Sequence, residues 1–79
     1  MSEQESEGTR LGRMVAAEPE LTRPEVTVAD REFSRRFIAY LMADGFSGRS
    51  ALTRMERLKF ETIVTGKSYG EVLAGTEEP

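Results

Sequence analysis

The chain has 79 residues, a formal net charge of −3, and no Cys, His or Trp. This composition excludes a disulfide scaffold, thiolate or imidazole metal sites, and every catalytic scheme built on His or Cys. No apolar run approaches the roughly 18 residues of a membrane span, and the acidic N-terminal stretch is the reverse of a signal peptide. We therefore expect one small cytoplasmic domain with no membrane association, which gains part of its stability from oligomerisation or from a partner.

The pooled charge hides an uneven distribution. Residues 1–22 carry a net charge of −3, and residues 68–79 again carry −3. The middle of the chain, residues 23–67, holds nine bases against six acids, a net charge of +3. A mildly basic centre between two acidic ends is compatible with a polyanionic partner, although helix surfaces often carry such charge without one.

The first 22 residues are polar, rich in Glu and interrupted by two glycines and Pro19. Such a stretch cannot bury a core, so we expect a disordered acidic N-terminal arm over residues 1–22.

Pro24 then holds the preceding residue extended, and polar and apolar residues alternate in the segment Glu25-Val26-Thr27-Val28, which is rich in β-branched side chains. This alternation predicts one short strand.

A helix is predicted over residues 31–43. Asp30 suits its N-cap, and Gly45 supplies the left-handed residue after its end. Three apolar residues recur on one face at a spacing of four, namely Phe33, Phe37 and Leu41. This spacing is typical of an amphipathic helix that packs on a core.

A second helix is predicted from Ser47 or Ser50 to about Thr65. At 100° per residue its apolar side chains cover about 240° of the circumference; they are Leu52, Met55, Leu58, Phe60, Ile63 and Val64. A helix that apolar needs burial on more than one side. We expect a second copy or a different protein to pack against it, and the alternative is a loosely packed helical hairpin.

The chain beyond the strand-helix-helix core of residues 23–66 is expected to form a short third helix and a frayed acidic tail over residues 67–79. Ser68 and Glu71 have the spacing of a capping box. Gly66-Lys67-Ser68 resembles the end of a phosphate-binding loop, but Glu61 occupies the position of the loop's first glycine. The acids fall at caps or on charged faces. We therefore expect no enzyme, no catalytic residue, no metal and no cofactor.

One segment carries a family resemblance. The turn and the start of the second helix read GFSGRSALTR at residues 45–54. With the strand and helix before it, this segment resembles the ribbon–helix–helix family of DNA-binding proteins over residues 24–58. The resemblance implies a mainly α fold in which one short N-terminal strand precedes two helices. It also implies that two chains pair their strands in the DNA major groove, while the second helices pack about the dimer axis.

The first functional hypothesis is therefore a homodimeric, sequence-specific DNA-binding regulator of the repressor or antitoxin type. The residues expected to contact nucleic acid are Arg23, Thr27, Arg31, Ser47, Gly48, Arg49 and Ser50. Those expected at the dimer or partner interface are Val26, Val28, Phe37, Leu41, Leu52, Met55, Phe60 and Ile63.

The alternative is a small protein-binding module, such as a phage-encoded inhibitor, adaptor or accessory subunit, that docks its helical hairpin on a larger protein. The acidic ends and the undersized core favour it. The outward positions of the predicted strand do so too, because Glu25, Thr27 and Ala29 offer no basic side chain. This hypothesis predicts a marginal monomer that ignores DNA and gains stability with its partner.

Overall fold

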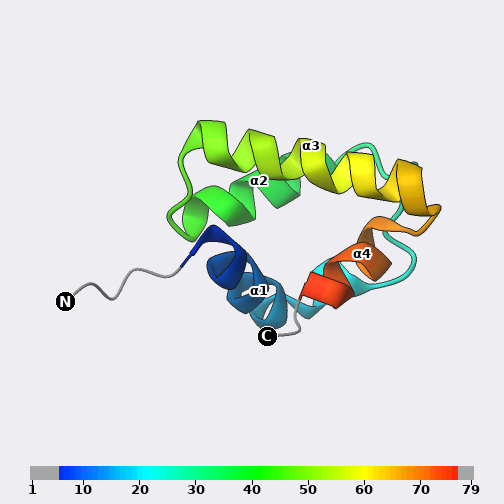
Figure 1. The fold of residues 1–79 in the computed structure, drawn as a ribbon, viewed down its shortest axis with the longest axis horizontal. Coiled ribbons are helices and arrows are strands. Elements are labelled where there is room, and N and C mark those ends of the chain that lie inside the picture. Colours follow the sequence, from blue (N-terminus) through cyan, green and yellow to red (C-terminus); the bar gives the residue numbers. More distant parts are fainter. Residues whose placement is uncertain (1–5, 77–79) are drawn as a thin grey trace.

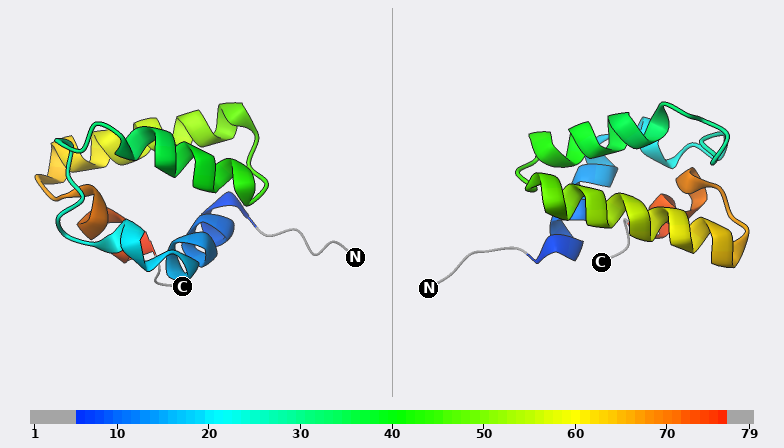
Figure 2. Two further views of the ribbon diagram at one scale, coloured as in Figure 1. Left: turned by 180° about the vertical axis from the view of Figure 1, so that it is seen from behind. Right: turned by 90° about the horizontal axis from the view of Figure 1, so that it is seen from above.

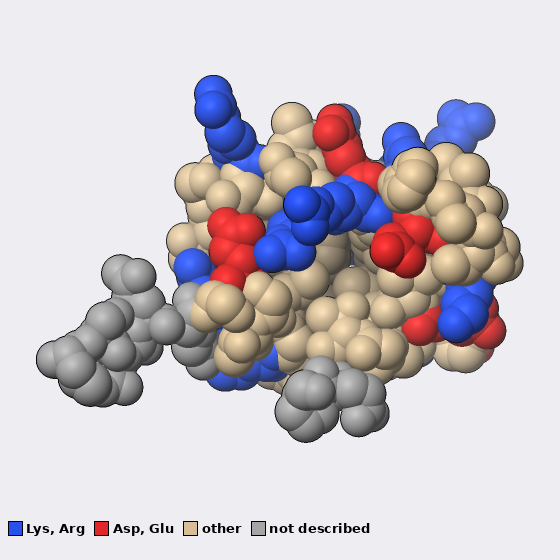
Figure 3. Space-filling model, viewed as in Figure 1, with Lys and Arg blue, Asp and Glu red and all other residues tan. Residues whose placement is uncertain are grey.

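The computed structural model describes residues 6–76, which form four α-helices and one 3-10 helix. The elements in chain order are α1 (Glu7–Ala17), η1 (Pro19–Thr22), α2 (Phe33–Ala43), α3 (Gly48–Thr65) and α4 (Tyr69–Thr76). Helices α2 and α3 form an antiparallel hairpin, and α1, η1 and α4 lie together along one side of it (Figures 1 and 2). The face of the molecule seen in Figure 1 carries interspersed acidic and basic side chains, without a single basic field (Figure 3).

The predicted strand at residues 25–28 is wrong, because this segment forms two consecutive turns and no residue between 6 and 76 is in a strand. The Val26 amide donates to the Arg23 carbonyl (3.0 Å) and the Asp30 amide donates to the Thr27 carbonyl (2.9 Å). Two amides that a β-ribbon would need are thus used locally. A single strand with no partner strand has no inter-strand hydrogen bonds to stabilise it, whatever the alternation of its side chains. The local hydrogen bonds of the turns therefore determine the conformation of this segment.

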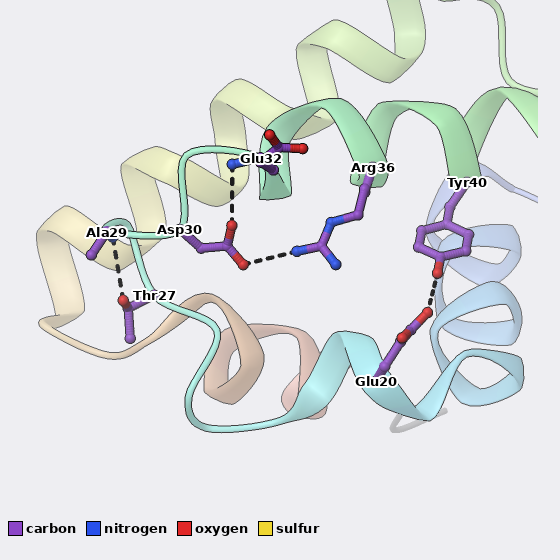
Figure 4. Close-up of polar contacts among 7 residues, drawn as sticks. All are labelled: Glu20, Thr27, Ala29, Asp30, Glu32, Arg36 and Tyr40. Carbon is purple, nitrogen blue, oxygen red and sulfur yellow. Dashed lines mark hydrogen bonds and ion pairs between the residues drawn. The ribbon is translucent and has the colours of Figure 1, made fainter.

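Side chains reinforce these turns (Figure 4). Thr27 Oγ1 accepts from the Ala29 amide (3.2 Å), and Asp30 Oδ1 accepts from the Glu32 amide (3.1 Å). The other oxygen of Asp30 pairs with Arg36 of α2 at 2.8 Å. Asp30 therefore ties the turn to α2, which begins at Phe33 and not at residue 31 as predicted.

The expectation of a disordered arm is wrong for residues 6–22; residues 1–5 lie outside the described part of the chain. Ser6 caps α1 by accepting from the Thr9 amide (3.1 Å). Four apolar side chains of α1 and η1 are buried, namely Leu11, Met14, Val15 and Leu21. These few apolar residues could not form a core by themselves. They are buried because α1 and η1 pack them into a core that the other helices share.

Two arginines of α1 hold the α2–α3 turn. Arg10 donates to the Asp44 carbonyl (2.9 Å) and lies over the Phe46 ring, 4.5 Å from its centroid. Arg13 pairs with the Asp44 carboxylate at 3.3 Å. Gly45, at φ 105°, closes α2 in the left-handed conformation that the sequence predicts.

The core joins all five elements. Phe33 stacks on Phe37 (centroids 5.6 Å apart) and on Tyr69 of α4 (4.7 Å). Burial raises the pKa of the Tyr69 phenol. The buried members of the core are Leu11, Met14, Val15, Leu21, Phe33, Phe37, Leu41, Phe46, Ala51, Met55, Leu58, Tyr69 and Leu73. The chain thus closes one core by itself, and α4 is the short C-terminal helix that follows Gly66.

Candidate protein-docking surface

Helix α3 is apolar on two sides, and only one of them is covered. Its buried face consists of Ala51, Met55, Leu58 and Thr62, which pack on the shared core. On the solvent side, four large apolar side chains are 51–71% exposed. We call this set, Leu52, Phe60, Ile63 and Val64, the α3 outer face. It is the part of the predicted 240° apolar wrap that the described chain leaves uncovered.

The α3 outer face continues onto the turn before α2. Val28 is 61% exposed and lines the same hollow as Ile63, about 470 Å³ in volume. Gly66 and Lys67 form another part of its wall. The apolar surface therefore extends past the end of α3, and Lys67 places a positive charge at its margin.

Charged side chains of both signs accompany these apolar residues along α3. Arg49, Glu56 and Lys59 are exposed, and none makes an ion pair or side-chain hydrogen bond with another residue between 6 and 76. Along the upper edge of the molecule, over α3, basic side chains predominate and an acidic side chain lies among them (Figure 3). The exposed charges of α3 are therefore of both signs.

The residues predicted for the interface divide into two groups. Phe37, Leu41 and Met55 are buried in the chain's own core, and Val26 is half-buried against it. These four therefore serve intramolecular packing. The other four remain accessible, namely Val28, Leu52, Phe60 and Ile63. Sequence reasoning missed Val64 for this set, although it follows Phe60 by one helical turn.

The residues predicted to hold a phosphate at the start of α3 are partly engaged within the chain. Ser47 Oγ caps α3 by accepting from the Ser50 amide (3.1 Å). The carboxylate of Glu7, on α1, pairs with Arg54 at 3.2 Å. A hydrogen bond from the Ser50 side chain, with the nearby Arg54, lowers the pKa of Glu7. An internal carboxylate thus competes with any anion at Ser50, while Gly48 and Arg49 stay exposed.

The other predicted nucleic-acid contacts lie at the opposite end of α2. Arg23, Thr27 and Arg31 precede α2, whereas the residues near Ser47 follow it, and the 11 residues of α2 separate the two groups by about 16 Å. Arg23 is within 3.9 Å of Glu25, so a carboxylate partly offsets its charge. With the strand absent, the predicted mode of base recognition has no structural basis, and DNA binding stays a prediction.

Two further hollows lie away from the α3 outer face. One, about 340 Å³, lies between α1, α3 and α4, and Phe37, Leu58 and Leu73 are among the residues that line it. The other, about 220 Å³, lies below α2, and its polar groups are satisfied internally. There Tyr40 donates to Glu20 (Figure 4), and this bond, with burial, raises the pKa of Tyr40.

The predicted capping box at the start of α4 is present: the Ser68 amide donates to Glu71 Oε1 (3.0 Å) and the Glu71 amide to Ser68 Oγ (3.1 Å). This bonding accounts for the residues that resemble a phosphate-binding loop.

Within residues 6–76, no group of three or more acidic, His or Cys side chains is placed to hold a metal ion. No helix in that range has the length and apolar character needed to cross a membrane. Comparisons with protein-family models, curated proteins and solved structures found no match.

Proposed function

We propose that this chain is a small, non-enzymatic protein-binding module that docks the α3 outer face against an amphipathic α-helix of a protein partner. The observation that carries the proposal is the exposure of Leu52, Phe60, Ile63 and Val64 on one side of a helix whose other side already completes a closed core. A cluster of this kind on a small chain is typical of a protein-interaction site, because apolar side chains exposed for no purpose are usually scattered.

The covered area would supply enough free energy for association. Full burial of one large apolar side chain contributes about 1.5–3 kcal/mol. The four side chains are each 51–71% exposed, so covering what remains would contribute roughly 4–8 kcal/mol before the costs of association. The partner's own apolar stripe would bury a comparable area, and the sum less an association cost of at least about 4 kcal/mol corresponds to a reversible complex. Charge pairs at the margin would improve its specificity more than its affinity.

The charge pattern defines the chemistry of the partner. Glu56 lies among the apolar residues of α3, with Lys59 one turn after it and Arg49 two turns before it. A helix with an apolar stripe and flanking charges of both signs would pair with all three. A nucleic acid would meet the Glu56 carboxylate at the centre of the contact, which is unfavourable next to phosphates.

The test is an amide-resonance NMR titration of the full chain with a synthetic amphipathic helical peptide that has a leucine stripe flanked by Lys and Glu. We expect shifts confined to amides of residues 49–66 and to Val28. The double variant Phe60→Glu with Ile63→Glu should abolish them. Its charge-matched control, Ala16→Glu with Ala74→Glu, changes two exposed alanines away from α3 and should bind as the wild type does.

Folding of the variants is monitored by far-ultraviolet circular dichroism and urea unfolding. Because Phe60 and Ile63 lie outside the core, both double variants should retain the wild-type helix content. Absence of peptide-induced shifts in a wild-type chain that is monomeric during the titration, or equal shifts in the Phe60/Ile63 variant, would refute the proposed function.

A further inference from the structure

Building on the proposed function, we infer that the partner helix is α3 of a second copy of this chain, packed antiparallel about a two-fold axis at the level of Arg57 and Leu58. Four exposed residues of α3 form the seam between the two helices, namely Leu52, Glu56, Lys59 and Ile63. Their spacings of four, three and four residues are those of a coiled-coil seam. At 100° per residue they lie within a sector of about 60°, so one straight partner helix contacts all four.

Read in the reverse direction, the seam places an apolar residue opposite an apolar residue and an acid opposite a base. Leu52 and Ile63 stand equally far from the midpoint of the seam, and so do Glu56 and Lys59. An antiparallel pair therefore places Leu52 of one copy opposite Ile63 of the other, and Glu56 opposite Lys59. Each match occurs twice because of the two-fold symmetry.

The parallel arrangement is disfavoured by the same residues. It would place Glu56 opposite Glu56 and Lys59 opposite Lys59, and like charges facing each other across a helix pair are destabilising. Charged residues at inner seam positions reduce the stability of a helix pair but select its orientation and register. The carboxylate and the ammonium group that would form the pair are both exposed and unpaired among residues 6–76.

The rest of the α3 outer face lies to one side of the seam. Phe60 and Val64 lie about 80° and 120° around the helix from Leu52, on the side away from the buried face. Phe60 lies about 70° from the middle of the seam and would flank the contact between the two helices, whereas Val64, about 110° away, stays outside it. Val28 shares a hollow with Ile63 and lies at the end of the seam, next to the expected position of the partner's Leu52. The antiparallel pair thus accounts for the exposure of Leu52 and Ile63, with Phe60 and Val28 at its edges.

The first test measures the association of the full chain by sedimentation equilibrium. We expect a reversible dimer. Ile63→Glu should weaken it by at least about a hundredfold, since Ile63 enters the dimer twice, whereas Ala74→Glu adds the same charge on α4 and should leave it unchanged. Reversing one seam charge, as in Glu56→Lys or Lys59→Glu, should weaken the dimer on the order of tenfold. The double reversal should restore it.

The second test fixes the orientation and exploits the absence of cysteine from the chain. A disulfide needs Cα atoms about 4.4–6.8 Å apart. In the antiparallel dimer, Leu52→Cys should cross-link to Ile63→Cys when the two variants are mixed. Neither variant should cross-link to itself, because the spacing of 11 positions separates identical sites by about 16 Å along the helix. A parallel dimer would give the opposite result.

These outcomes separate the inference from the proposed function. A wild-type chain that stays monomeric at high concentration, self-linking of either cysteine variant, or a dimer indifferent to both Ile63→Glu and the charge reversals overturns the self-pairing. Amide shifts with the synthetic helical peptide would then still support docking by α3. If the chain is monomeric and the peptide also produces no shifts, both the inference and the proposed function fail.

Discussion

Among the glycines that the structure describes, Gly70, in the first turn of α4, is the one whose added Cβ would lie nearest to another backbone segment. A Cβ atom added at Gly70 would lie 1.9 Å from the Arg23 carbonyl oxygen, 2.5 Å from its carbon and 2.8 Å from the Thr22 carbon. Ordinary contacts of a Cβ begin at 3.4 Å. The Gly70→Ala substitution therefore requires η1 and α4 to separate by about 1.5 Å at this point, judged by those distances.

That separation is costly because the obstacle is backbone and its surroundings are packed. The Gly70 amide donates to the Val26 carbonyl (3.2 Å), and its neighbours Tyr69 and Leu73 are buried in the core with Leu21 of η1. Overpacking of a core costs about 1–3 kcal/mol, and a rigid obstacle places this site near 3 kcal/mol. The higher helix propensity of Ala returns about 1 kcal/mol. The net loss should be about 2 kcal/mol, or roughly 8–16 °C in Tm for a domain of this size.

The matched control is Gly75→Ala, in the same helix. A Cβ at Gly75 meets nothing within 4 Å, so only the gain in helix propensity remains. Urea and thermal unfolding followed by circular dichroism should show Gly70→Ala destabilised and Gly75→Ala stabilised by up to about 1 kcal/mol. If Gly70→Ala is as stable as the wild type, or if both variants shift in the same direction, the close approach of η1 and α4 is wrong.

Three further predictions concern titration and packing. The pKa of Glu7 is lowered from 4.5, so the ionised carboxylate stabilises the fold above that pH, and this stabilisation is lost as pH falls through the folded-state pKa. In Glu7→Gln, the free energy of unfolding measured with urea should therefore fall less steeply as the pH is lowered. The pKa of Tyr40 is raised from 10.0, chiefly by its bond to Glu20, so the stability from this bond is present below pH 10.0 and is lost as pH rises through the folded-state pKa. Glu20→Gln should move the ultraviolet titration of Tyr40 back toward 10.0. Phe37→Ala, at a side chain that is 0% exposed, should cost about 3–5 kcal/mol, whereas Phe60→Ala, at one that is 65% exposed, should cost less than about 1 kcal/mol in dilute protein.

Each of these has a result that would contradict it. A fall in the free energy of unfolding at low pH that Glu7→Gln leaves unchanged would show that the contact of Glu7 with Ser50 and Arg54 does not form in solution. The Tyr40 titration is best read in a Tyr69→Phe background, because the chain has two tyrosines. A Tyr40 titration insensitive to Glu20→Gln would exclude their hydrogen bond. Equal destabilisation by the two Phe→Ala variants would mean that Phe60 belongs to the core.

Local sequence signals located the end of α2, both ends of α3 and the start of α4, because the bonds at a helix end involve neighbouring residues. The prediction that Asp30 is the N-cap of α2 is wrong, since Glu32 holds that position without a side-chain cap. Ser47 caps α3, Gly45 and Gly66 take positive φ after α2 and α3, and Ser68 with Glu71 forms the capping box of α4. These features need only the residue types at fixed offsets. The periodic Phe33, Phe37 and Leu41 likewise predict the buried face of α2, since the spacing places them on one side whatever they contact.

The candidate docking surface was predictable only in part. The excess of apolar residues on α3 predicted that one side would stay uncovered unless a partner packed on it, but the angular positions of these residues could not tell which side the chain itself would cover. Met55 and Leu58 are buried, and Phe60 and Ile63 are exposed, because α2 and α4 approach α3 from one direction. That direction depends on how α4 packs against α1 and η1. The residue pattern of α3 does not determine this packing.

The sequence by itself determined the caps of α3 and α4, the turns at Gly45 and Gly66 and the buried face of α2, because each depends on interactions within about one helical turn. The tertiary structure alone decided that residues 25–28 form turns and that residues 7–17 form a helix with one buried face. The Val26 carbonyl is held by the Gly70 amide, 44 positions along the chain, and Val15 is buried only because distant helices surround it. A four-residue alternation and a sparse amphipathic stretch are marginal signals, and contacts with distant residues determine which conformation such segments adopt.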